Sequence, residues 1–75
     1  MTKMRISLMS IDDVKSFTAI MNDTPFESGI ISGSYVVDAK SIMGIFSLDL
    51  GRPLDLAIQS DDCGDLPEKL ERFMA

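Results

Sequence analysis

Apolar residues recur along the chain with two different spacings, and the spacing predicts where strands and helices lie. Every second residue is apolar in residues 4–8 and again in Leu54–Ile58, as expected of strands with one buried face. A helix is predicted after Ser10, because the apolar residues there recur every three or four positions. They are Val14, Phe17, Ile20 and Met21.

The middle of the chain predicts a hairpin followed by a short helix. Residues 22–25 end the first helix, since proline disfavours helical geometry in the residue before it. Strands are expected at roughly 26–31 and at 35–38, joined by Ser-Gly-Ser, where glycine permits the positive φ of a tight turn. The apolar segment 41–48 then predicts a helix of one or two turns, with Ser41 suited to its N-cap.

The C-terminal segment predicts a last helix, and with it the fold class. Asp65 is expected to act as an acidic cap, followed by Pro67 in the first turn and Glu68 three residues on. The order β-α-β-β-α-β-α favours an α+β fold, in which a four-stranded antiparallel sheet carries three helices on one face and leaves the other to solvent. The apolar face expected for the last helix consists of Leu66, Leu70, Phe73 and Met74.

Length and charge narrow the classes of function. The 75 residues suffice for a single domain, 1–75, with one modest core. A net charge of −5 leaves no extended basic face, so neither nucleic acid nor an anionic membrane is an expected partner. The single cysteine, Cys63, cannot form an internal disulfide, and no apolar run approaches the ~20 residues that span a bilayer. We therefore expect a soluble, cytoplasmic protein.

Residues suited to catalysis or metal binding are scarce. The chain has no histidine, and with one cysteine a zinc site is not expected. The acidic run 61–65 lacks the ligand spacing of a calcium loop, and is interpreted as a solvated turn before the last helix. Asp12 and Asp13 are explained by the dipole of the helix they open. Cys63 has no neighbouring base or cation, and is interpreted as a small turn residue rather than a reactive thiol. We predict no catalytic residue, no metal and no cofactor.

The segment around Ser41 has two interpretations. Either all its apolar residues belong to the core and Ser41 is only a cap, or some of them form an exposed docking patch. The second interpretation follows if Ile45 and Leu48 face the sheet, because the remaining apolar residues then lie at least partly outside. Those residues are Ile42, Met43 and Phe46.

Residues 37–48 read VDAKSIMGIFSL and resemble the regulatory-serine region of HPr, the small phosphocarrier of the bacterial sugar phosphotransferase system. Looser agreement covers nearly the whole chain, and the resemblance implies the HPr-like open-faced β-sandwich. In the HPr/Crh family, especially in Gram-positive bacteria, the matching serine is phosphorylated by HPr kinase and the neighbouring helix docks on partner proteins. Ser41 is thus the implied phosphoacceptor. The implied docking residues are Lys40, Ile42, Met43 and Phe46.

The resemblance fails at one position that matters for sugar transport. The family's phosphocarrier histidine, followed by arginine and proline, lies at the start of the first helix, where this chain has Ser10 with Asp12 and Asp13 behind it. A phosphohistidine relay is therefore not expected, and two carboxylates would repel an incoming phosphoryl group. In this respect the chain resembles the HPr-like regulators that keep the serine and lack the histidine.

We therefore expect a non-enzymatic regulatory module for carbon catabolite control, switched by phosphorylation of Ser41. The resemblance implies HPr kinase, a transcriptional regulator or a phosphotransferase component as protein partners. Two alternatives stay open. The chain is a degenerate phosphotransferase component that accepts phosphate from enzyme I on Ser10 or an aspartate, or it is a constitutive scaffold in which Ser41 is never modified.

Overall fold

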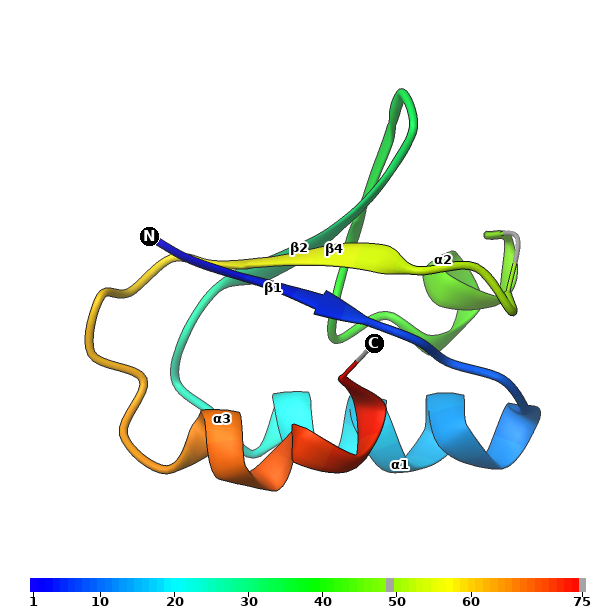
Figure 1. Ribbon diagram of the computed structural model, residues 1–75. Coiled ribbons are helices and arrows are strands. Elements are labelled where there is room, and N and C mark those ends of the chain that lie inside the picture. Colours follow the sequence, from blue (N-terminus) through cyan, green and yellow to red (C-terminus); the bar gives the residue numbers. More distant parts are fainter. Residues whose placement is uncertain (49, 75) are drawn as a thin grey trace.

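A four-stranded antiparallel sheet organises the protein, in the order β1-β4-β2-β3 (Figure 1). The computed structural model describes residues 1–48 and 50–74. The α+β class and the predicted order of strands and helices are confirmed. The strands are β1 (Thr2–Ile6), β2 (Ser28–Ser32), β3 (Tyr35–Asp38) and β4 (Leu54–Ile58), and the helices are α1 (Ile11–Asn22), α2 (Ile42–Phe46), α3 (Leu66–Lys69) and the 3-10 turn η1 (Glu71–Phe73).

The register of β4, in the middle of the sheet, separates a buried face from an open one. Leu56 lies opposite Met4 on β1 and Ile30 on β2, and both Leu56 and Ile30 are fully buried. On the open face Asp55 lies opposite Arg5, and the two side chains form an exposed ion pair of 3.3 Å. The alternation of apolar and polar residues therefore gives the sheet one core face, as the sequence predicts.

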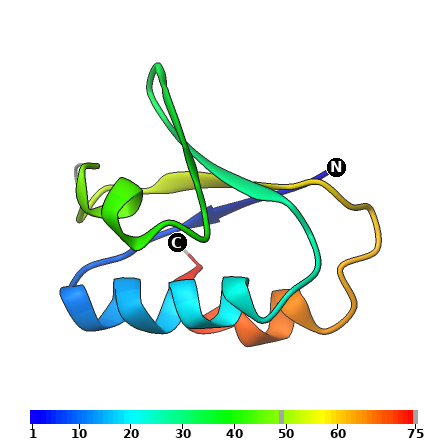
Figure 2. The same cartoon turned by 180° about the vertical axis from the view of Figure 1, so that it is seen from behind.

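Helices α1 and α3 run beneath the sheet and cover its buried face (Figure 1). The rings of Phe17 on α1 and Phe73 in η1 meet edge to face, with centroids 5.9 Å apart, and so pack the C-terminal segment against α1 in one core. Helix α2 lies at the end of the sheet, contacts β3 and α1, and buries Ile45 in the same core (Figure 2). None of the described helices is long and apolar enough to cross a membrane.

The predicted end of β1 and the predicted start of β2 were wrong, because a strand continues only where the neighbouring strand offers residues to pair with. β1 ends at Ile6, since Ile6 lies opposite Leu54, the first residue of β4. Leu8, predicted in the strand, lies beyond it although it is fully buried. β2 begins at Ser28 rather than at residue 26, since Ser28 lies opposite Ile58, the last residue of β4.

The prediction for the C-terminal helix was wrong in two respects. Asp65 makes no side-chain capping hydrogen bond; its carboxylate instead lies 3.8 Å from the ammonium of Lys69. Met74 does not lie on the buried helix face, because the chain turns to extended geometry there, pairs with Ile6 and leaves Met74 42% exposed. The other three residues predicted for that face are buried.

Two glycines offer a test of the sheet. A Cβ on Gly29 would meet Val36 and the backbone of Val37 at ordinary contact distances, whereas Gly33 has a φ of +60° in the turn of the hairpin. We expect Gly29→Ala to raise the free energy of unfolding by about 0.5–1 kcal/mol, because alanine restricts the unfolded chain and fits the strand. Urea unfolding followed by circular dichroism measures the change.

Gly33→Ala is the matched control. It should lower the free energy of unfolding by about 1–2 kcal/mol, since a Cβ is disfavoured at positive φ. Equal effects of the two substitutions would contradict the register of the hairpin.

Candidate functional site

Ser41 determines where α2 begins. Its backbone is extended, with φ −99° and ψ 104°, and its hydroxyl accepts a hydrogen bond of 3.3 Å from the N–H of Gly44. Its carbonyl accepts the first intrahelical bond, 3.1 Å long, from the N–H of Ile45. This is the geometry of a serine N-cap, as predicted, and Ser41 is exposed. The hydroxyl thus stabilises the helix and is also accessible from solvent.

The apolar residues of α2 divide between the core and the surface. Ile45 is fully buried, and Ile42 and Leu48 are half-buried against the core. Met43 is 74% exposed and Phe46 36% exposed. The interpretation that all the apolar residues of this segment belong to the core is therefore wrong, and the helix presents Met43 and Phe46 to solvent.

Gly44 lets the Ser41 turn approach the sheet closely. A Cβ at this position would lie 3.3 Å from the hydroxyl oxygen of Ser41 and 3.4 Å from Cβ of Val37 on β3. The first distance is tighter than most contacts that a Cβ makes, and the second is at the lower limit of ordinary van der Waals contact. The absence of a side chain at Gly44 therefore allows α2 to rest against β3 while the hydroxyl of Ser41 keeps its capping position.

Lys40, the residue before Ser41, has its ammonium group at the end of α1 rather than beside the Ser41 hydroxyl. Nζ donates a hydrogen bond of 3.0 Å to the carbonyl of Thr24, and the backbone N–H donates one of 2.9 Å to the carboxylate of Asp38. The carbonyl of Lys40 accepts a further bond, 3.2 Å long, from the side-chain amide of Asn22. The side chain of Lys40, a predicted docking residue, is thus engaged in a hydrogen bond within the molecule.

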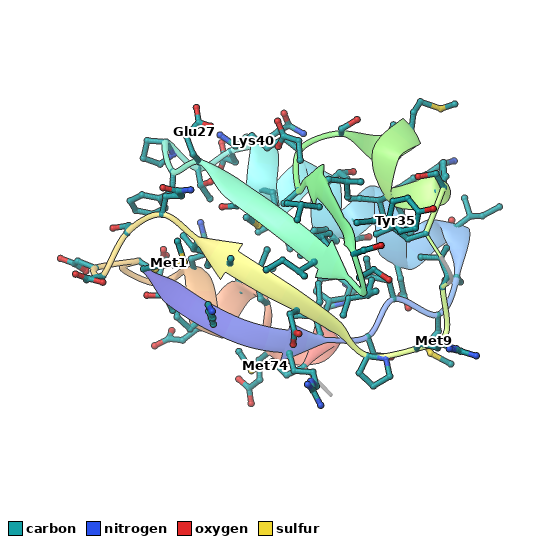
Figure 3. All side chains as sticks on the ribbon, turned by 90° about the horizontal axis from the view of Figure 1, so that it is seen from above. Met1, Met9, Glu27, Tyr35, Lys40 and Met74 are labelled. Carbon is teal, nitrogen blue, oxygen red and sulfur yellow. The ribbon has the colours of Figure 1, made fainter. Side chains whose placement is uncertain are left out.

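The start of α1 forms a capped turn around Ser10 and Asp13. The hydroxyl of Ser10 accepts a hydrogen bond of 3.2 Å from the N–H of Asp13, and the carboxylate of Asp13 accepts one of 3.1 Å from the N–H of Met9. Arg72 lies 3.9 Å from the same carboxylate. This end of α1 is separate from the Lys40 end: in Figure 3, Met9 lies at the lower right and Lys40 at the upper edge. These contacts give Asp13 a structural role at the start of α1.

Acidic side chains of the turn 61–65 also have hydrogen-bond partners within the protein. The N-terminal ammonium donates a hydrogen bond to Asp61, and this bond together with its charge holds the pKa of Asp61 below the usual value of 3.8. Asp62 accepts a hydrogen bond of 3.2 Å from the N–H of Gly64. Cys63 is buried in the core, with its thiol 3.5 Å from the carbonyl of Ser60. Among residues 1–48 and 50–74, no three metal-ligating side chains are grouped so that they could hold an ion.

Sequence reasoning missed Asn22 and Thr24, which hold the segment that leads to Ser41. In the sequence these residues signal only the end of a helix. Their contacts with Lys40 join positions 18 and 16 residues apart, and no local pattern indicates such a pair.

Comparison with solved structures shows the fold. A scan against protein-family models finds no match, and a search of curated proteins finds no significant relative. Among solved structures, the chain is similar to HPr-C-His from Thermoanaerobacter tengcongensis, with a TM-score of 0.78 and 22% identity over 96% of this chain and 89% of that one. It is also similar to the phosphocarrier protein HPr from Bacillus anthracis, with a TM-score of 0.74 and 21% identity over 99% and 96% of the two chains. The protein therefore has the HPr-like fold.

Proposed function

We propose that the protein is a regulatory, partner-binding module related to the phosphotransferase system. In this proposal it is not an enzyme and docks other cytoplasmic proteins through α2. Phosphorylation of Ser41 then switches the docking. The observation that carries the proposal is the exposure of Met43 and Phe46 on the short helix that the accessible Ser41 caps.

The chemistry of the chain argues against a role as a phosphohistidine carrier. The sequence contains no histidine at any position. At the start of α1, the Ser10 hydroxyl and the Asp13 carboxylate are both engaged in the helix cap. Donors and acceptors used in this way stabilise the helix, and the two aspartates there oppose an incoming phosphoryl group. A role that depends on α2 needs none of these groups.

A phosphate on Ser41 would change the surface that a partner meets. It adds about −1.5 to −2 charges at neutral pH, at the end of the helix where the backbone dipole favours negative charge. Met43 lies in the first turn of α2, directly after the capping residue. A partner that buries Met43 would therefore also bury or contact the phosphate, so its affinity would depend on whether basic groups face that position.

Ser41 phosphorylation is tested with an HPr kinase and ATP. Intact-mass measurement should show the gain of one phosphate in the wild-type chain and none in Ser41→Ala. Because Ser41→Ala also removes the cap, it should lower the free energy of unfolding by about 1 kcal/mol, and its folding is checked by circular dichroism. No mass gain in the wild type would remove the switch from the proposal.

Docking is tested with two methionines of similar exposure. Met43→Asp places a charge on α2, whereas Met9→Asp places one before α1, where Met9 is 66% exposed. We expect a partner captured from a cell lysate by the wild type to be lost with Met43→Asp and kept with Met9→Asp, because burying an unpaired charge is costly. The reverse result would move the docking surface to the start of α1.

A constitutive scaffold is the second candidate, because the Ser41 hydroxyl already has a structural use as the cap of α2. Ser41→Asp distinguishes the two functions, since aspartate keeps a capping oxygen and adds charge. A partner that binds Ser41→Asp as well as the wild type, and is lost with Met43→Asp, would favour a scaffold over a switch.

A further inference from the structure

The end of α1 and the loop before Ser41 are joined by hydrogen bonds across a large sequence separation. The side-chain amide of Asn22 donates to two carbonyls, that of Thr18 at 2.8 Å within its own helix and that of Lys40 at 3.2 Å. The ammonium of Lys40 returns to the carbonyl of Thr24 at 3.0 Å. Asn22 thus bonds to the loop before Ser41, and Lys40 in that loop bonds to the segment after α1. We call Asn22 and Lys40 the α1 clamp.

The clamp supplies what the end of α1 lacks. The last turn of α1 contains no basic residue, although a cation near that end is favoured by the helix dipole. Lys40 provides that cation from a different part of the chain. The interaction therefore stabilises α1 at the same time as it holds the loop.

The backbone of Lys40 is held from the other side by β3. Its N–H donates to the carboxylate of Asp38, and the N–H of Ser41 donates to the Asp38 carbonyl at 3.0 Å. Lys40 is therefore fixed at its N–H, its carbonyl and its ammonium. Ser41 is the next residue, so the place where α2 begins depends on these bonds.

We propose that Asn22 and Lys40 are positioning residues for Ser41, through which the end of α1 sets how the Ser41 hydroxyl is presented. The proposal rests on the proposed function only for the consequence that presentation matters to a kinase. The role of the clamp in ordering the loop stands independently, because the hydrogen bonds exist in the unmodified protein. Asn22 is the informative member, since it lies outside the predicted docking residues.

Amide hydrogen exchange tests the clamp directly. The N–H groups of Ser41, Gly44 and Ile45 all donate hydrogen bonds that depend on the loop geometry. In Asn22→Ala these three should exchange about tenfold faster, the change expected from losing one hydrogen bond in a local opening equilibrium. Gly33→Ala is the control for global destabilisation: it should accelerate the slowest amides of β4 but leave these three unchanged, because their local opening leaves the hairpin turn intact.

Matched variants separate positioning from disturbance of the helix end. Thr24→Val removes the side-chain bond from Thr24 to the Met21 carbonyl but keeps the Thr24 carbonyl that Lys40 uses, so it should leave the three reporter amides unchanged. Lys40→Met removes the ammonium and should accelerate the reporters, whereas Lys40→Arg should restore protection, because it keeps a donor. Unchanged reporters in both Asn22→Ala and Lys40→Met, or equal acceleration in Thr24→Val, would overturn the clamp.

The kinase assay connects the clamp to the proposed function. If wild-type Ser41 is phosphorylated, Asn22→Ala should raise KM several-fold with little change in kcat, because a mobile loop binds the kinase less often in the productive geometry. An unchanged KM would overturn the consequence for presentation. If wild-type Ser41 is not phosphorylated, the switch fails, while the exchange rates still decide whether the clamp exists.

Discussion

One constraint governs the arrangement of this small protein: its sheet has a single face to bury, and β4 lies in the middle of it. Leu56 is enclosed by neighbours on both sides and by the helices below. Once α1 and α3 have covered that face, little core remains for a third helix. α2 is five residues long and fully buries only Ile45. The exposure of Met43 and Phe46 is therefore a consequence of how the core is filled.

The sequence predicts the interior of each element better than its ends. The bounds of β3 and β4 agree with the structure; β3 follows the glycine-containing hairpin turn, and β4 follows Pro53. The end of β1 and the start of β2 depend instead on where β4 begins and ends, and no local pattern contains that information. The prediction for Met74 was wrong for a related reason. Its spacing is helical, but Met74 is extended and pairs with Ile6, which is distant in the sequence.

The candidate site shows the same division between local and distant information. That Ser41 caps a helix follows from residue type and position, and the structure agrees. How Lys40 is used could not be predicted in this way, since its partners Asn22 and Thr24 come from the end of another helix. Next to a serine that could carry phosphate, a lysine suggests charge pairing. In the unmodified protein its ammonium serves the end of α1.

The two ends of α1 consequently have different relations to the rest of the molecule. At the start, the side-chain hydrogen bonds of Ser10 and Asp13 join residues at most four positions apart, and Arg72 adds an ion pair to the Asp13 carboxylate. At the end, Asn22 lies in hydrogen-bond contact with the segment that carries Ser41. A local cap limits the effect of a change at Ser10 to its own turn, whereas a change at Asn22 reaches the start of α2 through hydrogen bonds. Among the described residues, the hydrogen bonds that join α1 to the segment carrying Ser41 therefore lie at the C-terminal end of this helix, in addition to the packing of α1 against α2.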